Sequence, residues 1–289
     1  MIDYFLNSKL SKKYYSGSER KIGIIFNNEK YMLKFRKKNN FVTKFNHVSE
    51  YLGSHIFNLI GIKVQETFLG LYNGEEVVAC KDFITDEGKF VPFNEIGESS
   101  LETDKEKYQY SYDDILELIN KNTKIKDKRK TIENFFDIFI VDALIGNFDR
   151  HGMNWGFIKS YNKYELSPVF DNGSCLFPSM VDDEEMIRIM NDKGETNNRV
   201  YNFPTSQIKL HDRKSSYFDV INSLEFEECN NALLRIFPRI NMDAIYVLID
   251  ETPFITDVHK MFYKHILKNR YEKIIKASYL KLVKRNETD

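Results

Sequence analysis

The sequence predicts an α+β fold with two lobes, a small sheet-rich lobe over residues 1–83 and a larger helical lobe over residues 84–289. Two observations lead to this prediction. The first 80 residues contain short β-rich runs around one helix, whereas helical periodicities dominate after about residue 84. The chain has 289 residues, of which 42% are hydrophobic, and this is enough for two lobes with a substantial core.

The predicted small lobe begins with a hairpin of Ile22–Phe26 and Tyr31–Phe35, separated by a polar turn. A helix follows, because apolar residues recur at helical spacing from Phe45 to Leu59, and Gly61 is a natural stop. Two further strands, about Ile62–Tyr72 and Glu76–Cys80, meet at the turn signal Asn73-Gly74.

In the predicted large lobe, helices are expected near Tyr112–Asn120 and Ile132–Ile145. A second hairpin, roughly Trp155–Ile158 and Glu165–Val169, comes next. The remainder is expected to be helical, with a final helix that carries Tyr263, Leu267, Tyr271 and Ile274 on one face.

Bulk composition excludes several classes of protein. The formal net charge is −1, so no direct binding of nucleic acid is expected. The three cysteines are scattered and form no CxxC pair, which argues against a disulfide framework and a structural zinc site. We find no signal peptide and no 18-residue apolar run, so we expect a cytoplasmic protein that is not inserted in a membrane, with export by another route left open.

The stretch most indicative of chemistry is Gly146-Asn147-Phe148-Asp149-Arg150-His151-Gly152-Met153-Asn154, between the apolar helix and the second hairpin. That hairpin leads into Asp171-Asn172-Gly173. Phosphoryl transfer requires one carboxylate near the attacking hydroxyl and further oxygen ligands for Mg²⁺. Asp149, Asn154 and Asp171 have the residue types and order for these roles. The alternative is that Asp149 and Asn154 only cap a helix or shape a turn.

A kinase also needs a lysine on the phosphates and a carboxylate to hold it. Lys34 is a charge inside an apolar strand, and Glu50 is the only acidic residue between residues 35 and 65. We therefore expect the two to pair, because a half-buried lysine needs an anionic partner. The alternative is a lysine on an edge strand whose charged end reaches water.

Other candidate residues rest on weaker signals. A loop of small residues, Ser16, Gly17, Ser18 and Lys21, could direct backbone N–H groups and a charge at phosphate, although a plain turn is equally compatible. Lys81, Asp82 and Phe83 fall where the lobes would join and are assigned to adenine by position alone. His151 could touch phosphate or brace the loop through hydrogen bonds.

With these residues in place, the chain resembles the HipA-like serine/threonine kinases. The resemblance is carried by the N-x-D-R-H-x-x-N core from Asn147 to Asn154, by Leu166-Ser167-Pro168-Val169-Phe170-Asp171, and by the positions of Ser16–Lys21, Lys34 and Glu50. It implies a two-lobed protein-kinase-like fold and dependence on ATP and Mg²⁺. It implies Asp149 as catalytic base and Asn154 and Asp171 as Mg²⁺ ligands. It also implies that the remaining residues surround ATP, namely Ser16–Lys21, Lys34, Lys81–Phe83, His151 and Phe170.

The resemblance also suggests partners and regulation. The chain begins almost directly at the predicted phosphate loop, so it resembles a short branch of the family that lacks an extra amino-terminal subdomain. A protein substrate is expected, with a small antitoxin or regulator protein as a further candidate partner. Ser16 and Ser18 are candidates for autophosphorylation. Gly173–Lys209 would be an activation region, whose acidic run Asp182–Glu185 either recruits a basic substrate or forms a solvated loop.

Two alternatives from other classes stay open at this point. The same Asp-Arg-His-x-x-Asn core occurs in phosphatidylinositol kinases, so a kinase for a small molecule or an inositol lipid is the first alternative. The second is a non-catalytic ATP-binding module that acts as a toxin-like interaction protein. The complete set of Lys34, Glu50, Asp149, Asn154 and Asp171 favours a serine/threonine protein kinase over both.

Overall fold

The computed structural model describes residues 2–13, 15, 20–38, 43–84, 88–96, 110–210 and 213–288. The predicted phosphate-loop residues Ser16, Gly17 and Ser18 lie outside the described residues. The chain divides into two compact units. Unit 1 consists of Met1–Phe83, Phe170–Asn191 and Asn241–Lys264, and unit 2 of Ile84–Val169, Asp192–Ile240 and His265–Asp289. The residues predicted as the small lobe thus all belong to unit 1, together with two later segments.

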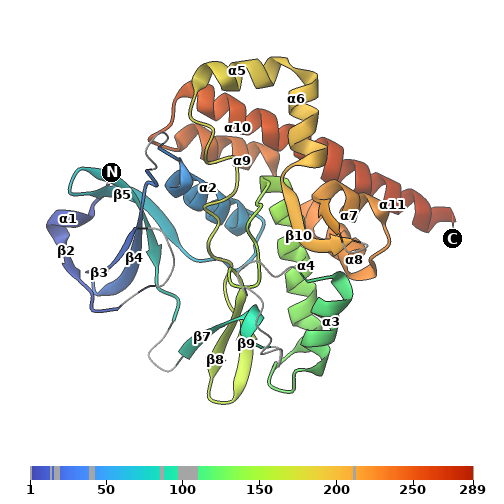
Figure 1. The fold of residues 1–289 in the computed structure, drawn as a ribbon, viewed down its shortest axis with the longest axis horizontal. Coiled ribbons are helices and arrows are strands. Elements are labelled where there is room, and N and C mark those ends of the chain that lie inside the picture. Colours follow the sequence, from blue (N-terminus) through green and yellow to red (C-terminus); the bar gives the residue numbers. More distant parts are fainter. Residues whose placement is uncertain are drawn as a thin grey trace. The chain divides into compact units, whose positions relative to one another are not determined.

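Unit 1 is built on a six-stranded sheet with the strand order β1-β5-β6-β4-β3-β2, of which Figure 1 labels β2, β3, β4 and β5. Its strands are β1 (Ile2–Asp3), β2 (Ser8–Leu10), β3 (Lys21–Phe26), β4 (Glu29–Phe35), β5 (Thr67–Tyr72) and β6 (Glu75–Lys81). All neighbours are antiparallel except β1 and β5, which run parallel. The tight β3–β4 turn places Asn27 and Asn28 at positive φ, which asparagine tolerates better than most residues.

The two faces of this sheet have different coverings. One face carries a cluster of buried aromatic and aliphatic side chains: Tyr4, Ile24, Tyr31, Leu33, Phe35, Val77 and Ala79. Helix α2 (Asn46–Leu59) packs against β5 and β6, and α9 (Met242–Glu251) packs against α2. Unit 1 also contains the short helix α1 (Tyr4–Asn7), α5 (Asp183–Asn191) and the first half of α10 (Asp257–Arg270).

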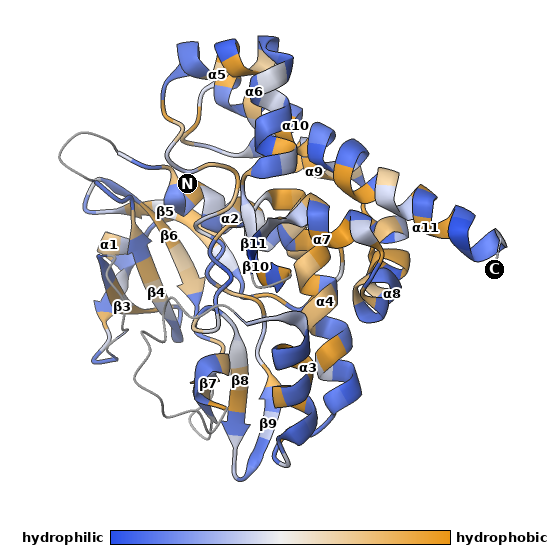
Figure 2. Cartoon of the chain, turned by 45° about the vertical axis from the view of Figure 1, so that its right-hand side comes forward, coloured by the Kyte–Doolittle hydropathy of each residue, from blue (hydrophilic) through white to orange (hydrophobic). Residues whose placement is uncertain are grey.

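Unit 2 is organised around helix α4 (Lys128–Ile145), which Figure 2 shows as largely hydrophobic. The Asp127 side chain caps its first turn, and Gly146 ends it at a φ of 65°, a left-handed conformation that glycine adopts without steric cost. Helices α3 (Tyr112–Lys121), α7 (Tyr217–Ser223) and α8 (Glu227–Ile236) pack against α4. The chain then leaves α4 directly into the motif around Asp149.

The other elements of unit 2 are shorter. A three-stranded sheet has the order β7-β8-β9, from β7 (Gly88–Pro92), β8 (Gly156–Ser160) and β9 (Lys163–Leu166), and a two-stranded sheet pairs β10 (Thr205–Leu210) with β11 (Arg213–Ser216). The helical elements are η1 (Phe93–Glu95), α6 (Lys193–Asn197), the π-helix η2 (Asn198–Asn202), η3 (Phe237–Arg239), the π-helix η4 (Tyr271–Lys276) and α11 (Ala277–Thr288). Among the described residues, no helix is long and apolar enough to cross a membrane.

Several sequence-based boundaries are wrong. The strand predicted from Ile62 begins at Thr67, because ladder pairing with β6 starts there. The remainder after the second hairpin is not wholly helical, since β10 and β11 form a ladder within it. In β10 the alternating buried residues are Ser206 and Ile208, and a buried serine hides the two-residue period from a hydrophobicity pattern.

Candidate active site

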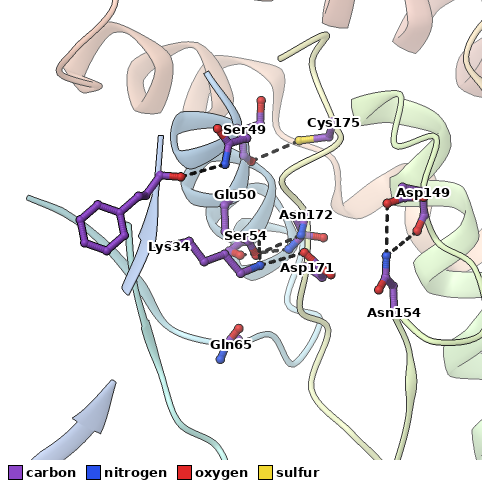
Figure 3. Close-up of polar contacts among 12 residues, drawn as sticks. Lys34, Ser49, Glu50, Ser54, Gln65, Asp149, Asn154, Asp171, Asn172 and Cys175 are labelled. Atoms are coloured by element: carbon purple, nitrogen blue, oxygen red, sulfur yellow. Dashed lines mark hydrogen bonds and ion pairs between the residues drawn. The ribbon is translucent and has the colours of Figure 1, made fainter. Parts of the chain in front are cut away.

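Lys34 lies at the centre of a buried ion-pair cluster in unit 1. Its Nζ is 2.7 Å from Oε2 of Glu50 on α2 and 2.8 Å from Oδ1 of Asp171 (Figure 3). Burial by itself would lower the pKa of Lys34, but the carboxylates of Asp171 and Glu50 outweigh it and raise this pKa well above its usual value. Lys34 therefore carries a fixed positive charge at neutral pH.

The strand explains why Lys34 points toward α2. Its neighbours Leu33 and Phe35 belong to the apolar cluster on the opposite face of the sheet, and side chains alternate along a strand. Lys34 is 4% exposed, so the alternative of a lysine that reaches water is wrong. The predicted pairing of Lys34 with Glu50 is present, and Asp171 joins the same cluster.

The segment that carries Asp171 is held on α2 by its neighbours. The Asn172 backbone N–H donates to Oε1 of Glu50 at 3.0 Å, and the Asn172 amide donates to Oγ of Ser54 at 3.0 Å. The Cys175 thiol donates to the Ser49 carbonyl at 3.2 Å. Asp171 itself has a φ of 58°, an uncommon conformation for a residue with a side chain.

A glycine makes this close approach possible. A Cβ added to Gly53 would lie 2.7 Å from Cβ of Asn172 and 3.0 Å from Sγ of Cys175. Any side chain at this position of α2 would push the segment 171–175 away from the helix. Glu50 and Ser54 thus bind Asn172, and Gly53 leaves room for it. These contacts on one face of α2 determine where the neighbouring Asp171 lies.

In unit 2, Asp149 and Asn154 contact each other directly. The Asn154 amide nitrogen donates to the Asp149 carbonyl oxygen at 2.8 Å and lies 3.4 Å from its carboxylate Oδ2 (Figure 3). Because the amide nitrogen of Asn154 faces Asp149, its amide oxygen, on the other branch of the amide group, does not. The Asp149 side chain is 44% exposed, which leaves its carboxylate accessible to a reacting group.

His151 is oriented by its own loop. The Met153 backbone N–H donates to its Nδ1 at 3.2 Å, which makes Nε2 the protonated nitrogen of the neutral ring. That Nε2 lies 3.6 Å from Oδ1 of Asp149. His151 thus faces the carboxylate of Asp149, as a bracing role requires.

Beneath the loop, a buried pair fixes its path. The Arg150 guanidinium donates to both carboxylate oxygens of Asp142 on α4, at 3.0 and 3.1 Å, and to the Asn154 carbonyl at 3.1 Å. The Asn147 side chain donates to Asp142 at 3.0 Å and accepts the Asp149 backbone N–H at 3.1 Å. Both ends of the Asp149–Asn154 segment are therefore anchored to the same carboxylate.

The residues assigned to adenine, Lys81–Phe83, and the predicted ATP-pocket residue Phe170 divide into two groups. The rings of Phe83 and Phe170 lie 5.7 Å apart in unit 1, so these two predicted residues are brought together. The Lys81 side chain instead pairs with Glu29 at 2.7 Å, and the Asp82 carboxylate is engaged by Lys13 and by the Tyr15 hydroxyl. The backbone N–H groups of Lys81 and Asp82 donate to the carbonyls of Glu66 and Lys30, and the Lys81 carbonyl accepts the Gln65 amide. The structure therefore does not direct the side chains or N–H groups of Lys81 and Asp82 at a base.

Sequence reasoning missed several residues that shape these sites. They are Gly53, Ser54, Asp142 and Asn172, together with the anchoring role of Arg150. The position of Asn172 directly after Asp171 was a signal that could have drawn attention to it. Nothing local marks Gly53, since its contact partners are more than 100 residues away in the chain.

Metal binding by protein groups alone is not supported in the described part of the chain, where no three His, Cys, Asp or Glu side chains are grouped to hold an ion. Magnesium commonly takes one or two protein oxygens and completes its shell with phosphates and water. Asn154 of unit 2 and Asp171 of unit 1 each carry an oxygen of the type that Mg²⁺ binds.

Comparison with known proteins places this arrangement in a family. The chain is 39% identical over 278 residues to the serine/threonine-protein kinase CtkA of Helicobacter pylori strain J99, covering 93% of this chain and 85% of that protein. The crystal structure of the H. pylori proinflammatory kinase CtkA superposes with a TM-score of 0.90 at 38% identity, covering 98% of both chains. The predicted α+β fold is confirmed by this match.

A more distant structure has the same fold. A complex of HipA with HipB and operator DNA from Shewanella oneidensis superposes with a TM-score of 0.59 at 14% identity, over 93% of this chain and 68% of that chain. Residues 14–232 match the HipA-like C-terminal domain. This chain therefore belongs to the HipA-like C-terminal domain family.

Proposed function

We propose that this protein is a serine/threonine protein kinase that uses ATP and Mg²⁺ and transfers the γ-phosphoryl group to a protein hydroxyl. The observation that carries the proposal is the buried cluster of Lys34, Glu50 and Asp171. Burying a charged lysine costs free energy unless the charge is paired. Lys34 is paired with Asp171, whose side chain is partly exposed. This arrangement is suited to binding phosphate oxygens next to a metal ion. The kinase relative CtkA, at 39% identity, supports the same conclusion.

In this proposal, bound ATP and Mg²⁺ supply the phosphoryl group and neutralise the charge that develops on it. Lys34 holds the phosphate tail, and Glu50 keeps Lys34 in place. Asn154 and Asp171 would hold the Mg²⁺ ion. Phe83 and Phe170 contact the base of the nucleotide, and His151 and Lys21 belong to the same proposed binding site. Lys81 and Asp82 are proposed to contribute through the path of the chain that carries Phe83.

The chemical step falls to Asp149. Its carboxylate accepts the proton of the acceptor hydroxyl as that oxygen attacks the γ-phosphorus of ATP and the bond from this phosphorus to the oxygen of the leaving ADP breaks. The exposure of Asp149 allows a protein substrate to reach it. His151, with Nε2 toward the carboxylate, orients Asp149. Asn147, Asp142 and Arg150 keep the loop in this conformation, which is the positioning contribution to catalysis.

The proposed partners follow from the activity. A protein with an accessible serine or threonine is the substrate, and Ser16 or Ser18 of the chain itself is the proposed autophosphorylation site. A small regulator protein of the antitoxin kind is a further proposed partner, on family membership alone.

The test uses purified wild type and Asp149→Asn, with radiolabelled ATP, Mg²⁺ and a basic protein acceptor. Asp149→Asn is expected to transfer phosphate about 10²- to 10⁴-fold more slowly, because the general base is lost. ATP-dependent thermal stabilisation is expected to persist, because Asp149 does not hold the nucleotide. The exposed Asp113→Asn on α3 is the matched control. Equal transfer by wild type and Asp149→Asn would refute the assignment.

A further inference from the structure

A buried arginine ties the start of the Asp149 loop to a distant segment of unit 2. Arg270 is fully buried, and its guanidinium donates to the Ala143 carbonyl at 2.8 Å and to the Arg199 carbonyl at 2.6 Å. Among the described residues it has no carboxylate partner, and burial lowers the pKa of Arg270 to about 10. The Arg270 guanidinium therefore joins the carboxyl end of α4 to the π-helix η2. A positive charge is favourable there, because the carboxyl end of a helix is the negative end of its dipole.

The residues that follow η2 continue this attachment. A Cβ on Gly146 would lie 3.4 Å from Pro204, so this proline packs on the residue that ends α4. The Gln207 amide donates to the Phe148 carbonyl at 2.7 Å, and the Tyr217 hydroxyl donates to the Asn147 carbonyl at 2.6 Å. Residues 199–210 and 213–217 thus form a wall along Asn147 and Phe148, the two residues that precede Asp149.

This wall presents an exposed aromatic ring. Phe203 is 43% exposed, and its ring lies 5.7 Å from the half-buried ring of Phe148. Large exposed aromatic side chains beside a reacting group are candidates for recognition, because they bind apolar groups with little loss of side-chain entropy. Both rings belong to segments that Arg270 and Gln207 bind through hydrogen bonds.

A small apolar cavity lies along the same wall. Its volume is about 30 Å³, and its lining is mostly aromatic and aliphatic, with Phe139, Trp155 and Ile208 among these side chains. His151, Gly152 and Gln207 also line it, as does the buried pair of Asp142 and Arg150, whereas Phe203 and Phe148 lie outside its lining. Gln207 therefore borders the cavity while it binds Phe148. Such a space suits roughly one or two methyl-sized groups rather than a ring.

We propose that Phe203 and Phe148 form an acceptor-specificity site, which binds an aliphatic side chain next to the phosphorylated serine or threonine of the substrate. The inference rests on the proposed kinase function and deepens it. An extended peptide advances about 3.3 Å per residue. When the acceptor hydroxyl of the substrate lies at Asp149, the substrate residues one to three positions along the peptide therefore lie over the loop residues next to Asp149. The two rings are apolar and most of the cavity lining is too, so the favoured flanking residue is leucine, isoleucine, valine or methionine.

The experiment is a positional peptide library around a central serine, phosphorylated with radiolabelled ATP and Mg²⁺. Wild type is expected to prefer leucine over serine at one flanking position by about tenfold in kcat/KM. Phe203→Ala is expected to reduce that preference to about threefold or less, with an unchanged rate on the all-polar peptide. Phe203→Asp is expected to shift the preference at the same position toward lysine or arginine.

The matched control is Tyr161→Ala, an aromatic residue 87% exposed on the β8–β9 turn, which is expected to leave the preference unchanged. Thermal unfolding of each variant checks that the fold is intact. If wild type phosphorylates peptides with no flanking preference, or Phe203→Ala keeps the preference, the specificity site is refuted while the kinase function stands. If wild type phosphorylates neither peptide, protein nor itself, the proposed function fails, and the inference falls with it.

Discussion

The two units hold their candidate site residues by different physical means. In unit 1, Lys34, Glu50 and Asp171 are fixed by charge, in an environment where Lys34 and Glu50 are almost inaccessible to water. In unit 2, Asp149 is held by neutral hydrogen bonds to its backbone and is 44% exposed. A group that binds highly charged phosphates has to be pre-arranged and desolvated, whereas a base has to remain reachable by an acceptor. We therefore expect substitutions in the ion pairs of unit 1 to lower stability, and substitutions of Asp149 in unit 2 to lower the catalytic rate.

The largest expected effect on stability comes from Lys34→Met. This substitution leaves Glu50 as a buried charge without its cation, which is expected to lower the free energy of unfolding by about 3–5 kcal/mol. Chemical denaturation measures the change, with the exposed Lys63→Met as the control. The double variant Lys34→Met/Glu50→Leu is expected to recover much of the stability but no kinase activity, because the charge for phosphate is still missing. A loss no greater than that of Lys63→Met would contradict the role of the ion pair in unit 1.

A second variant tests how the Asp171 segment is attached to α2. Replacing glycine by alanine inside a helix ordinarily stabilises it by about 1 kcal/mol. Gly53→Ala is expected to do the opposite and cost roughly 1–3 kcal/mol, because its Cβ would lie 2.7 Å from Cβ of Asn172. Weaker ATP-dependent thermal stabilisation is expected as well, since Asp171 would shift.

The sign of the effect is the critical result for Gly53→Ala. The exposed Asn58→Ala on the same helix serves as control and is expected to change stability little. If Gly53→Ala raised the free energy of unfolding, the close contact between α2 and the segment 171–175 would not constrain the protein.

The smallest effect concerns pH and is confined to unit 1. His259 is 1% exposed against the rings of Phe45 and Tyr263, and burial lowers its pKa to about 4, with Arg36 adding to this and Asp183 opposing it. A histidine with a depressed folded-state pKa stabilises the fold above its unfolded pKa of about 6.5, and this contribution is lost as the pH falls toward 4. Lowering the pH from 7.5 to 5.5 is expected to cost roughly 1 kcal/mol through His259.

Thermal unfolding at the two pH values measures this difference. The variant His259→Gln cannot be protonated in this range and is expected to show a smaller decrease than wild type. His47, whose pKa burial also lowers, contributes in the same direction and remains in both proteins. Equal decreases in the two proteins would exclude His259 as a source of acid sensitivity.

Much of the fold was predictable because its signals are local. The β3–β4 hairpin, α2, the β5–β6 turn and α4 were marked by periodicity and turn residues within the segments themselves. The amino-terminal elements β1, α1 and β2 were not predicted. Strand β1 forms by pairing with β5, and β2 by pairing with β3, and both partner strands come later in the chain. The β10–β11 ladder escaped notice because serine occupies one of its buried positions.

The sequence by itself was enough to select the candidate site residues, because the motif from Asn147 to Asn154 is contiguous and Asp171 follows at the end of a hairpin. It also indicated the pairing of Lys34 with Glu50, since a lone charge in an apolar strand requires a partner. Only the tertiary structure decided what supports these residues. Gly53 against Asn172 and Arg270 against Ala143 join positions more than 100 residues apart, and close packing between distant segments leaves no local pattern in a sequence.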